Sequence, residues 1–136
     1  MGKFTFNLRD FIRGMKKGNY DQIENYLFGI DKKTGNLCGC ALGQGILNSG
    51  LVDVDEIKRS IESQGTVSET DFRPNGTGKT ERRKILVNPK MEETWMHRLN
   101  SDLGDDFVEM IYTYNDDGRE MPEIIDSALQ YEAEGV

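Results

Sequence analysis

The sequence is poor in cysteine and has no long apolar run, which excludes several classes of protein. Its two cysteines, Cys38 and Cys40, are too few for a disulfide scaffold, and a bridge across the single Gly39 between them would be strained. Two thiols without a framework are typical of a reducing cytosol. No segment approaches the roughly 18 apolar residues of a membrane helix, and the N-terminus lacks the apolar core of a signal peptide. We therefore expect a cytoplasmic protein that does not contact a membrane.

Basic residues are almost missing from the last quarter of the chain. Residues 101–136 contain eleven aspartates and glutamates and one base, Arg119, which gives this segment a net charge of −10. Residues 1–100 contain sixteen bases and thirteen acids, a net charge of +3. A chain divided in this way either folds its basic part onto its acidic part or presents one of them to a partner. The overall net charge of −7 argues against general nucleic-acid binding.

Length and composition predict a single, mainly α domain spanning residues 1–136, with its last part, 101–136, helical and acidic. The evidence is a series of helix caps followed by apolar residues at i, i+3 and i+4, which indicates about six or seven helices. With their flanking caps, the expected helices cover residues 7–18, 19–29, 39–48, 53–65, 95–99, 102–114 and 121–134.

The segment 64–90 breaks the helical pattern, because it contains three glycines and two prolines. Val67 and residues 85–87 predict two short strands joined at an Asn75-Gly76 turn, so we expect a short β-hairpin inserted between helices. A long loop is the alternative interpretation of the same segment.

Acidic side chains on the last two predicted helices form the first candidate site. They recur at i, i+3 and i+4, where like charges repel each other by a few tenths of a kcal/mol per pair. Such a row of carboxylates can imitate nucleic-acid phosphates and occupy a basic groove on another protein. The simpler interpretation is an acidic surface that only keeps the protein in solution. The predicted partner-binding residues are Asp102, Asp105, Asp106, Glu109, Glu123 and Asp126.

The two cysteines support an alternative function. Because a helix N-terminus lowers the pKa of a thiol, Cys38 or Cys40 would be the nucleophile of a small cysteine hydrolase, with His97 as its base. The structural interpretation is that Cys40 packs in the core. A zinc site is less favoured, because a Cys-x-Cys pair does not have the usual ligand spacing. We assign no catalytic residue, metal or cofactor.

A basic segment supports a second alternative. Residues 79–90 contain five bases and one acid, and the RNA-contacting residues of such a basic loop would be Lys79, Arg82, Arg83 and Lys84. The segment lacks the interleaved aromatic residues that favour single-strand binding. The competing interpretation is a basic loop that folds onto the acidic helices of the same chain.

The helix start Cys40-Ala-Leu-Gly43, followed much later by Asn115-Asp116 before a final helix, resembles a group of small bacteriophage and actinobacterial proteins with no assigned activity. The match covers six positions in two patches, and the segment 65–89 has no counterpart. The resemblance implies that Cys40 and Asn115-Asp116 meet in the fold, for example with Asp116 near a helix N-terminus.

The acidic helices favour a non-enzymatic accessory protein, and the resemblance implies one of phage type that acts in the host cytosol. It would bind a host protein through its acidic helices. The most specific form of this hypothesis is a nucleic-acid mimic that inhibits a defence complex. Direct binding of nucleic acid is not expected.

Overall fold

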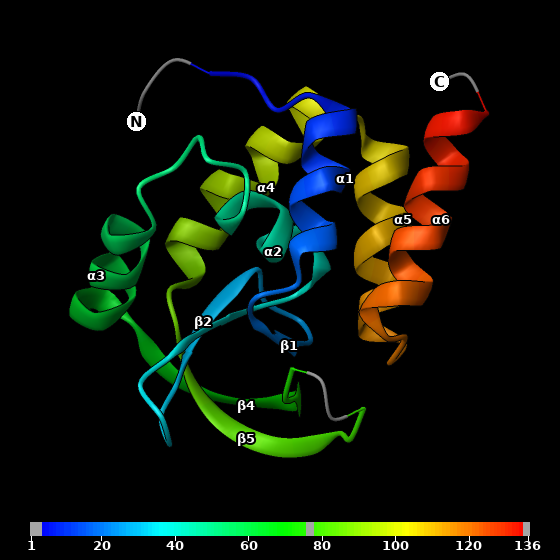
Figure 1. The fold of residues 1–136 in the computed structure, drawn as a ribbon. Helices are drawn as coiled ribbons and strands as arrows, with labels where there is room; N and C mark the ends of the chain where they lie inside the picture. The colour runs from blue at the N-terminus through cyan, green and yellow to red at the C-terminus, as the bar shows by residue number, and fades with distance from the viewer. Residues whose placement is uncertain (1–3, 76–77, 135–136) are drawn as a thin grey trace.

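The structure is a computed structural model that describes residues 4–75 and 78–134, and over these residues it contains five strands and six helices. The strands are β1 (Asp21–Ile23), β2 (Phe28–Asp31), β3 (Leu37–Gly39), β4 (Thr66–Arg73) and β5 (Glu81–Val87). The helices are α1 (Leu8–Lys17), α2 (Ala41–Leu47), α3 (Val54–Gln64), α4 (Pro89–Leu103), α5 (Asp105–Asp116) and α6 (Met121–Ala133). Figure 1 shows the strands at one end of the molecule and most of the helices stacked over them.

The strands overturn the expectation of a mainly α fold with a short hairpin. They form a closed barrel in the order β1-β3-β2-β5-β4, and β4 returns to pair with β1. The β1–β3 pair is parallel and the other pairs are antiparallel. The expected β4–β5 hairpin is confirmed, but it is longer than predicted and runs from the Thr66–Val87 pair to the Phe72–Glu81 pair. Gly76 of its expected turn lies outside the described residues.

The prediction of a helix over residues 19–29 is wrong. This segment forms β1, an irregular connection and the start of β2. The connection contains Asn25 with a φ of 72°, a left-handed conformation that no helix accommodates. Ile23 and Leu27 have helical spacing, but Ile23 belongs to the barrel interior and Leu27 to the core between the helices. Both are buried, so hydrophobicity alone did not separate the two environments.

Local caps explain the helices that were predicted. The Asn7 side chain accepts a hydrogen bond from the Asp10 backbone at the start of α1, and Gly18 ends that helix with a φ of 53°. The Asp53 side chain caps α3 in the same way. The helix expected at 95–99 is longer in the structure, because Asn88 caps it and Pro89 begins it.

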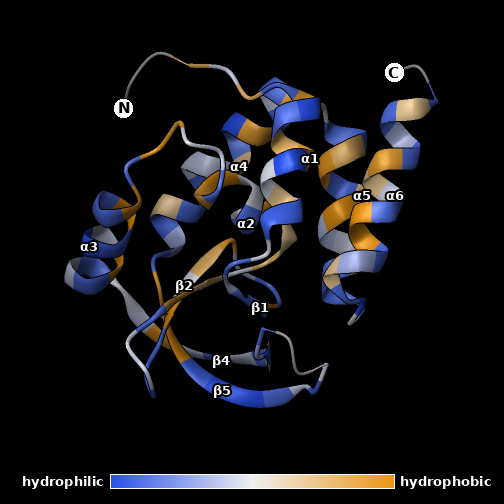
Figure 2. Cartoon of the chain, viewed as in Figure 1, coloured by the Kyte–Doolittle hydropathy of each residue, from blue (hydrophilic) through white to orange (hydrophobic). Residues whose placement is uncertain are grey.

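The buried apolar residues that the structure describes form two hydrophobic clusters. A small one fills the barrel and consists of Ile23, Cys38, Phe72, Ile85 and Val87. The larger one lies between the helices and the outside of the barrel. Figure 2 shows the change along β5, which is hydrophilic at its start and hydrophobic where it enters the barrel core.

Helix α2 lies at the centre of this arrangement, and each of its seven residues is buried. It follows β3 after a single residue, Cys40, and packs directly on the chain that leads into β2. A Cβ atom on Gly43 would lie 1.7 Å from the backbone oxygen of Leu27, so only glycine permits this approach. Helices α1 and α5 pack against α2 from either side. Within the described part of the chain, no helix is long and apolar enough to cross a membrane.

Candidate functional site

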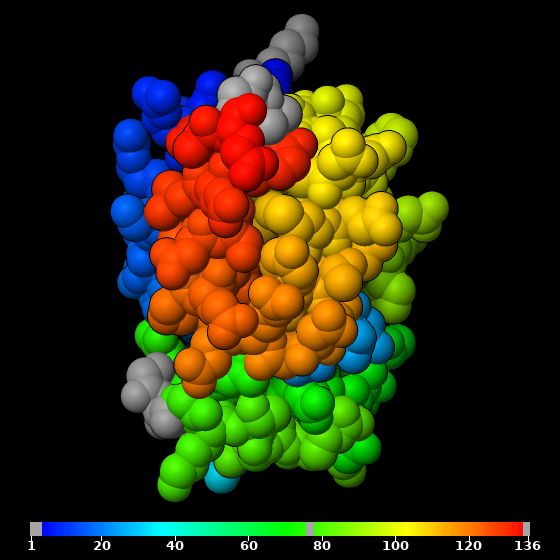
Figure 3. All heavy atoms as spheres, turned by 90° about the vertical axis from the view of Figure 1, so that its right-hand side faces the viewer, coloured from blue at the N-terminus to red at the C-terminus, as the bar shows by residue number. Residues whose placement is uncertain are grey.

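Helices α5 and α6 lie side by side and form one outer wall of the molecule. Figure 3 shows this wall directly, with the barrel below it. The exposed acidic residues of the two helices define what we call the acidic face. Its members are Asp105, Asp106, Glu109, Glu123 and Asp126.

Most carboxylates of the acidic face have no partner among the residues that the structure describes. Throughout residues 4–75 and 78–134, no hydrogen bond or ion pair involves the side chains of Asp105, Asp106, Glu109 or Asp126. The only base in the last quarter of the chain, Arg119, lies 3.7 Å from the Glu123 carboxylate and 4.0 Å from the Tyr114 ring centroid. The acidic face therefore keeps a concentrated negative charge that the fold itself does not neutralise.

Asp102, the sixth predicted binding residue, does not belong to the acidic face. Its carboxylate accepts a 2.9 Å hydrogen bond from the Phe6 backbone and lies 3.8 Å from the Arg98 guanidinium. Its side chain is only 14% exposed. Asp102 thus attaches the N-terminal segment to α4, whereas the other five predicted residues are exposed on α5 and α6.

Two apolar side chains on the same helices were not predicted as part of the site. Tyr112 on α5 is 40% exposed, and Leu129 on α6 is 37% exposed. Protein interfaces combine such apolar contacts with polar ones. The sequence gives only a weak signal for them, because both residues lie next to buried positions in an apolar stripe.

A buried amide attaches α5 to the rest of the fold. The Asn115 side chain is completely buried, and its oxygen accepts hydrogen bonds of 2.9 Å from the Gln22 side chain and from the Ala41 backbone. Its nitrogen donates a 2.7 Å hydrogen bond to the Ile23 carbonyl. The contact implied by the resemblance is therefore present beside Cys40, but Asn115 rather than Asp116 reaches the start of α2. Asp116 instead accepts a hydrogen bond from the Asn25 backbone.

The two cysteines are structural in this geometry. Cys38 fills the barrel, and the Cys40 sulfur accepts a hydrogen bond from the Gly43 backbone as the cap of α2. Burial raises the pKa of both thiols, that of Cys40 to about 12, which outweighs the lowering effect of the helix N-terminus. His97 lies on an exposed position of α4 and forms no hydrogen bond with either thiol. The site needed by a cysteine hydrolase is therefore not assembled.

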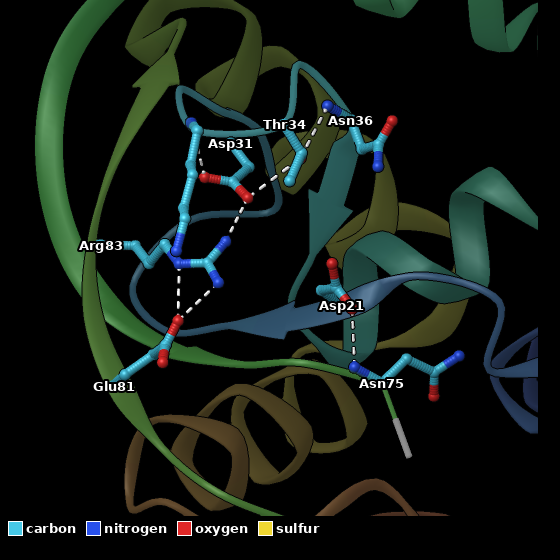
Figure 4. Close-up of polar contacts among 8 residues, drawn as sticks. Asp21, Asp31, Thr34, Asn36, Asn75, Glu81 and Arg83 are labelled. Carbon is cyan, nitrogen blue, oxygen red and sulfur yellow. Dashed lines mark hydrogen bonds and ion pairs between the residues drawn. The ribbon is translucent and has the colours of Figure 1, made fainter. Parts of the chain in front are cut away.

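Two arginines of the basic segment, Arg82 and Arg83, pair with carboxylates on the barrel strands. Arg83 forms an ion pair with the buried Asp31 and with Glu81, as Figure 4 shows, and its guanidinium lies 4.3 Å from the Phe72 ring centroid. Arg82 lies 3.2 Å from Asp71 across the β4–β5 pair. These two arginines are part of β5 rather than of a loop, and their charges are largely compensated.

Lys84 and Lys79, the other members of the basic loop, are both exposed, and Lys84 lies on β5. Among the residues that the structure describes, no three histidine, cysteine, aspartate or glutamate side chains gather closely enough to hold a metal ion. A comparison of the chain with protein-family models, curated protein sequences and solved structures finds no match in any of the three.

Proposed function

We propose that this protein is a non-enzymatic accessory protein of phage type, whose acidic face binds a basic, nucleic-acid-binding surface on a host protein. The observation that supports this most strongly is a set of four exposed carboxylates on two adjacent helices, none of which is paired within the described part of the chain. These are Asp105, Asp106, Glu109 and Asp126.

Electrostatics explains why such a face favours a basic partner. Asp105, Asp106 and Glu109 lie within five consecutive residues of α5, and carboxylates at this spacing repel one another. Lysine and arginine side chains of a partner would remove the repulsion and accelerate association. The first two also lie in the first turn of α5, where the helix dipole favours negative charge.

The partner class follows from the same charge pattern. A surface that binds nucleic acid presents lysines and arginines spaced to meet phosphates, and exposed carboxylates on two adjacent helices would meet the same groups. Tyr112 and Leu129 would add apolar contacts that phosphates do not offer, which favours a protein partner over free cations. The resemblance to phage proteins makes a host defence complex in the bacterial cytosol the specific target that we propose.

A retention experiment tests this function. The immobilised protein is exposed to bacterial lysate at roughly physiological salt, with and without nuclease, and retained proteins are identified by mass spectrometry. We expect a nucleic-acid-binding protein that remains after nuclease treatment and that an added double-stranded oligonucleotide releases. If the oligonucleotide releases no retained protein, the proposal of a nucleic-acid mimic is wrong.

A further inference from the structure

A cavity lies between helices α3 and α4. Helix α3 packs on β2 and β5 rather than on α4, which leaves space between the two helices. The cavity has a volume of about 470 Å³, within the range of pockets that hold small molecules. Figure 1 shows α3 on the opposite side of the molecule from α6. This cavity therefore takes no part in the proposed protein-binding function, and the two proposals succeed or fail independently.

Most of the described residues that line the cavity are apolar. They belong to the N-terminal segment, to the loop between α2 and α3, and to both helices, and they are Phe4, Leu51, Val52, Ile57, Met91 and Trp95. Figure 2 shows the hydrophobic stretch of that loop in orange. Leu51 is 46% exposed, so much of its apolar surface is in contact with water. An apolar molecule in the cavity would cover this surface, which is favourable.

The charged residues among those lining the cavity are both acidic, Asp53 and Glu56. Both are exposed, and neither forms an ion pair with a residue that the structure describes. One Asp53 oxygen accepts a 3.2 Å hydrogen bond from the Glu56 backbone, which does not neutralise its charge. With Asp55, three carboxylates lie at the start of α3 and outweigh the roughly half positive charge of a helix N-terminus.

No base in the described part of the chain balances these carboxylates by direct contact. Lys58 and Arg59 follow on α3, but neither lines the cavity or forms an ion pair with a described residue. The other lining residues, Ser60 and Thr94, are neutral. The cavity thus combines apolar walls with a negative rim, and this charge favours a cation over an anion.

We infer that this cavity binds a small apolar molecule that carries a positively charged amino group. The apolar body of the ligand packs against Leu51, Ile57 and Trp95. The ammonium group lies at the rim beside Asp53 and Glu56. Because these carboxylates are exposed, the apolar body supplies most of the affinity and the ammonium group supplies the preference for a cation.

Three probes with the same apolar body and different charges test the inference: phenylbutylamine, the neutral phenylbutanol and the anionic phenylbutyrate. Trp95 is the only tryptophan of the chain, so tryptophan fluorescence of the whole protein reports on the cavity. We expect a saturable change, with the amine binding about threefold more tightly than the alcohol and the carboxylate binding more weakly than both. If no probe binds, or if the three bind equally, the inference is wrong.

Two variants separate the charged contact from the apolar one. Glu56→Gln removes one rim charge at similar size, and glutamine is also favoured at this third position of a helix. It should weaken binding of the amine about threefold and leave the alcohol unchanged. Leu51→Ser shortens an exposed apolar side chain and should weaken both about threefold.

Glu62→Gln is the matched control, because it changes an exposed acid further along α3 that does not line the cavity, and it should have no effect. Equal affinities of the Glu56 and Glu62 variants for the amine would contradict the assigned cation site. Sedimentation tests a different occupant of the cavity. We expect the same monomeric mass with and without Leu51→Ser, whereas a dimer that this change dissociates would mean that a second copy covers the cavity and would overturn the inference.

Discussion

The side-chain oxygen of Asn115, on α5, lies 2.9 Å from the backbone nitrogen of Ala41, the first residue of α2. The same amide also joins α5 to β1 through the Gln22 side chain and the Ile23 carbonyl. One buried residue therefore fixes the helix that bears most of the acidic face against both the central helix and the barrel.

Removing this amide should destabilise the fold strongly. Asn115→Ala removes the side-chain partner of the Ala41 backbone N–H and of the Ile23 carbonyl, while the Gln22 nitrogen keeps its hydrogen bond to the Arg119 carbonyl, and we expect the free energy of unfolding to fall by about 3 kcal/mol. Urea denaturation measures the change. Asn100→Ala on α4, whose side chain forms no hydrogen bond in the described part of the chain, should change stability by less than about 1 kcal/mol. Similar stabilities of the two variants would contradict the anchoring role.

Several helices could be predicted because they begin with a signal in the adjacent sequence. Asn7 and Asp53 lie immediately before an apolar pattern and cap the helices that follow. Pro122 in the first turn of α6 is a similar local signal. These interactions connect residues three or four positions apart, so the sequence contains all the information that they need.

The barrel could not be predicted because its strands are short and its pairings are distant. β1 and β3 have three residues each and β2 has four, too few to show an alternating pattern. Closure depends on pairs such as Gln22 with Arg73, which are far apart in the chain. Their partnership is decided by packing and not by local preference.

The candidate site was predictable in part for the same reason. Net charge identified the acidic helices, but it did not distinguish Asp102, which turns inward to the Phe6 backbone 96 positions away. The resemblance indicated Asn115, whereas nothing in the sequence separates the buried Gln44 from an exposed glutamine. Buried polar residues are recognised only when their distant partners are known.

The Arg83–Asp31 ion pair provides a second test of the barrel. Asp31 is completely buried, so Arg83→Met would leave its charge without compensation and should cost about 3 kcal/mol or more in denaturant unfolding. Arg82→Met removes the exposed pair with Asp71 and should cost no more than about 1 kcal/mol. Adding Asp31→Asn to the Arg83 variant should recover part of the lost unfolding free energy, because it removes the uncompensated buried charge. If Arg83→Met and Arg82→Met lowered the unfolding free energy equally, this description of the barrel would be contradicted.

Glu92 should make stability depend on pH. Its carboxylate accepts hydrogen bonds of 2.5 and 3.0 Å from the Leu27 and Phe28 backbones, yet burial raises its pKa to about 7. Because the folded pKa lies above the unfolded one, near 4.3, its stabilising contribution is complete below that value and is lost as pH rises through 7. The loss amounts to at most about 4 kcal/mol.

The pH effect is measured as the difference in unfolding free energy between Glu92→Gln and the unchanged protein. From pH 5 to pH 8 this difference should shift in favour of the variant. Glu93→Gln, the exposed neighbour, should show a flat difference over the same range. A flat difference for Glu92→Gln as well would mean that this carboxyl ionises normally in the fold.

The buried thiols should be unreactive. Because burial raises the pKa of Cys38 and Cys40, we expect both to react with iodoacetamide much more slowly than free cysteine at neutral pH, and at the normal rate in urea. Mass spectrometry of the alkylated protein gives the two rates. One thiol that reacts faster than free cysteine in the folded protein would instead favour the hydrolase hypothesis.

Charge reversal on the acidic face tests the central claim most directly. One variant carries Asp105→Lys, Asp106→Lys, Glu109→Lys and Asp126→Lys. Its matched control reverses four exposed acidic residues outside the acidic face. As in the first variant, two of them lie in the first turn of a helix and two lie further along a helix. The control changes are Asp55→Lys, Glu56→Lys, Glu62→Lys and Glu93→Lys.

Both variants undergo the same overall change in charge, and circular dichroism and thermal unfolding verify that each remains folded. The measurement is retention of the host protein captured from bacterial lysate at roughly physiological salt. We predict that the variant of the acidic face loses the captured protein, whereas the control retains it. Equal retention by the two folded variants would contradict a partner-binding role for the acidic face.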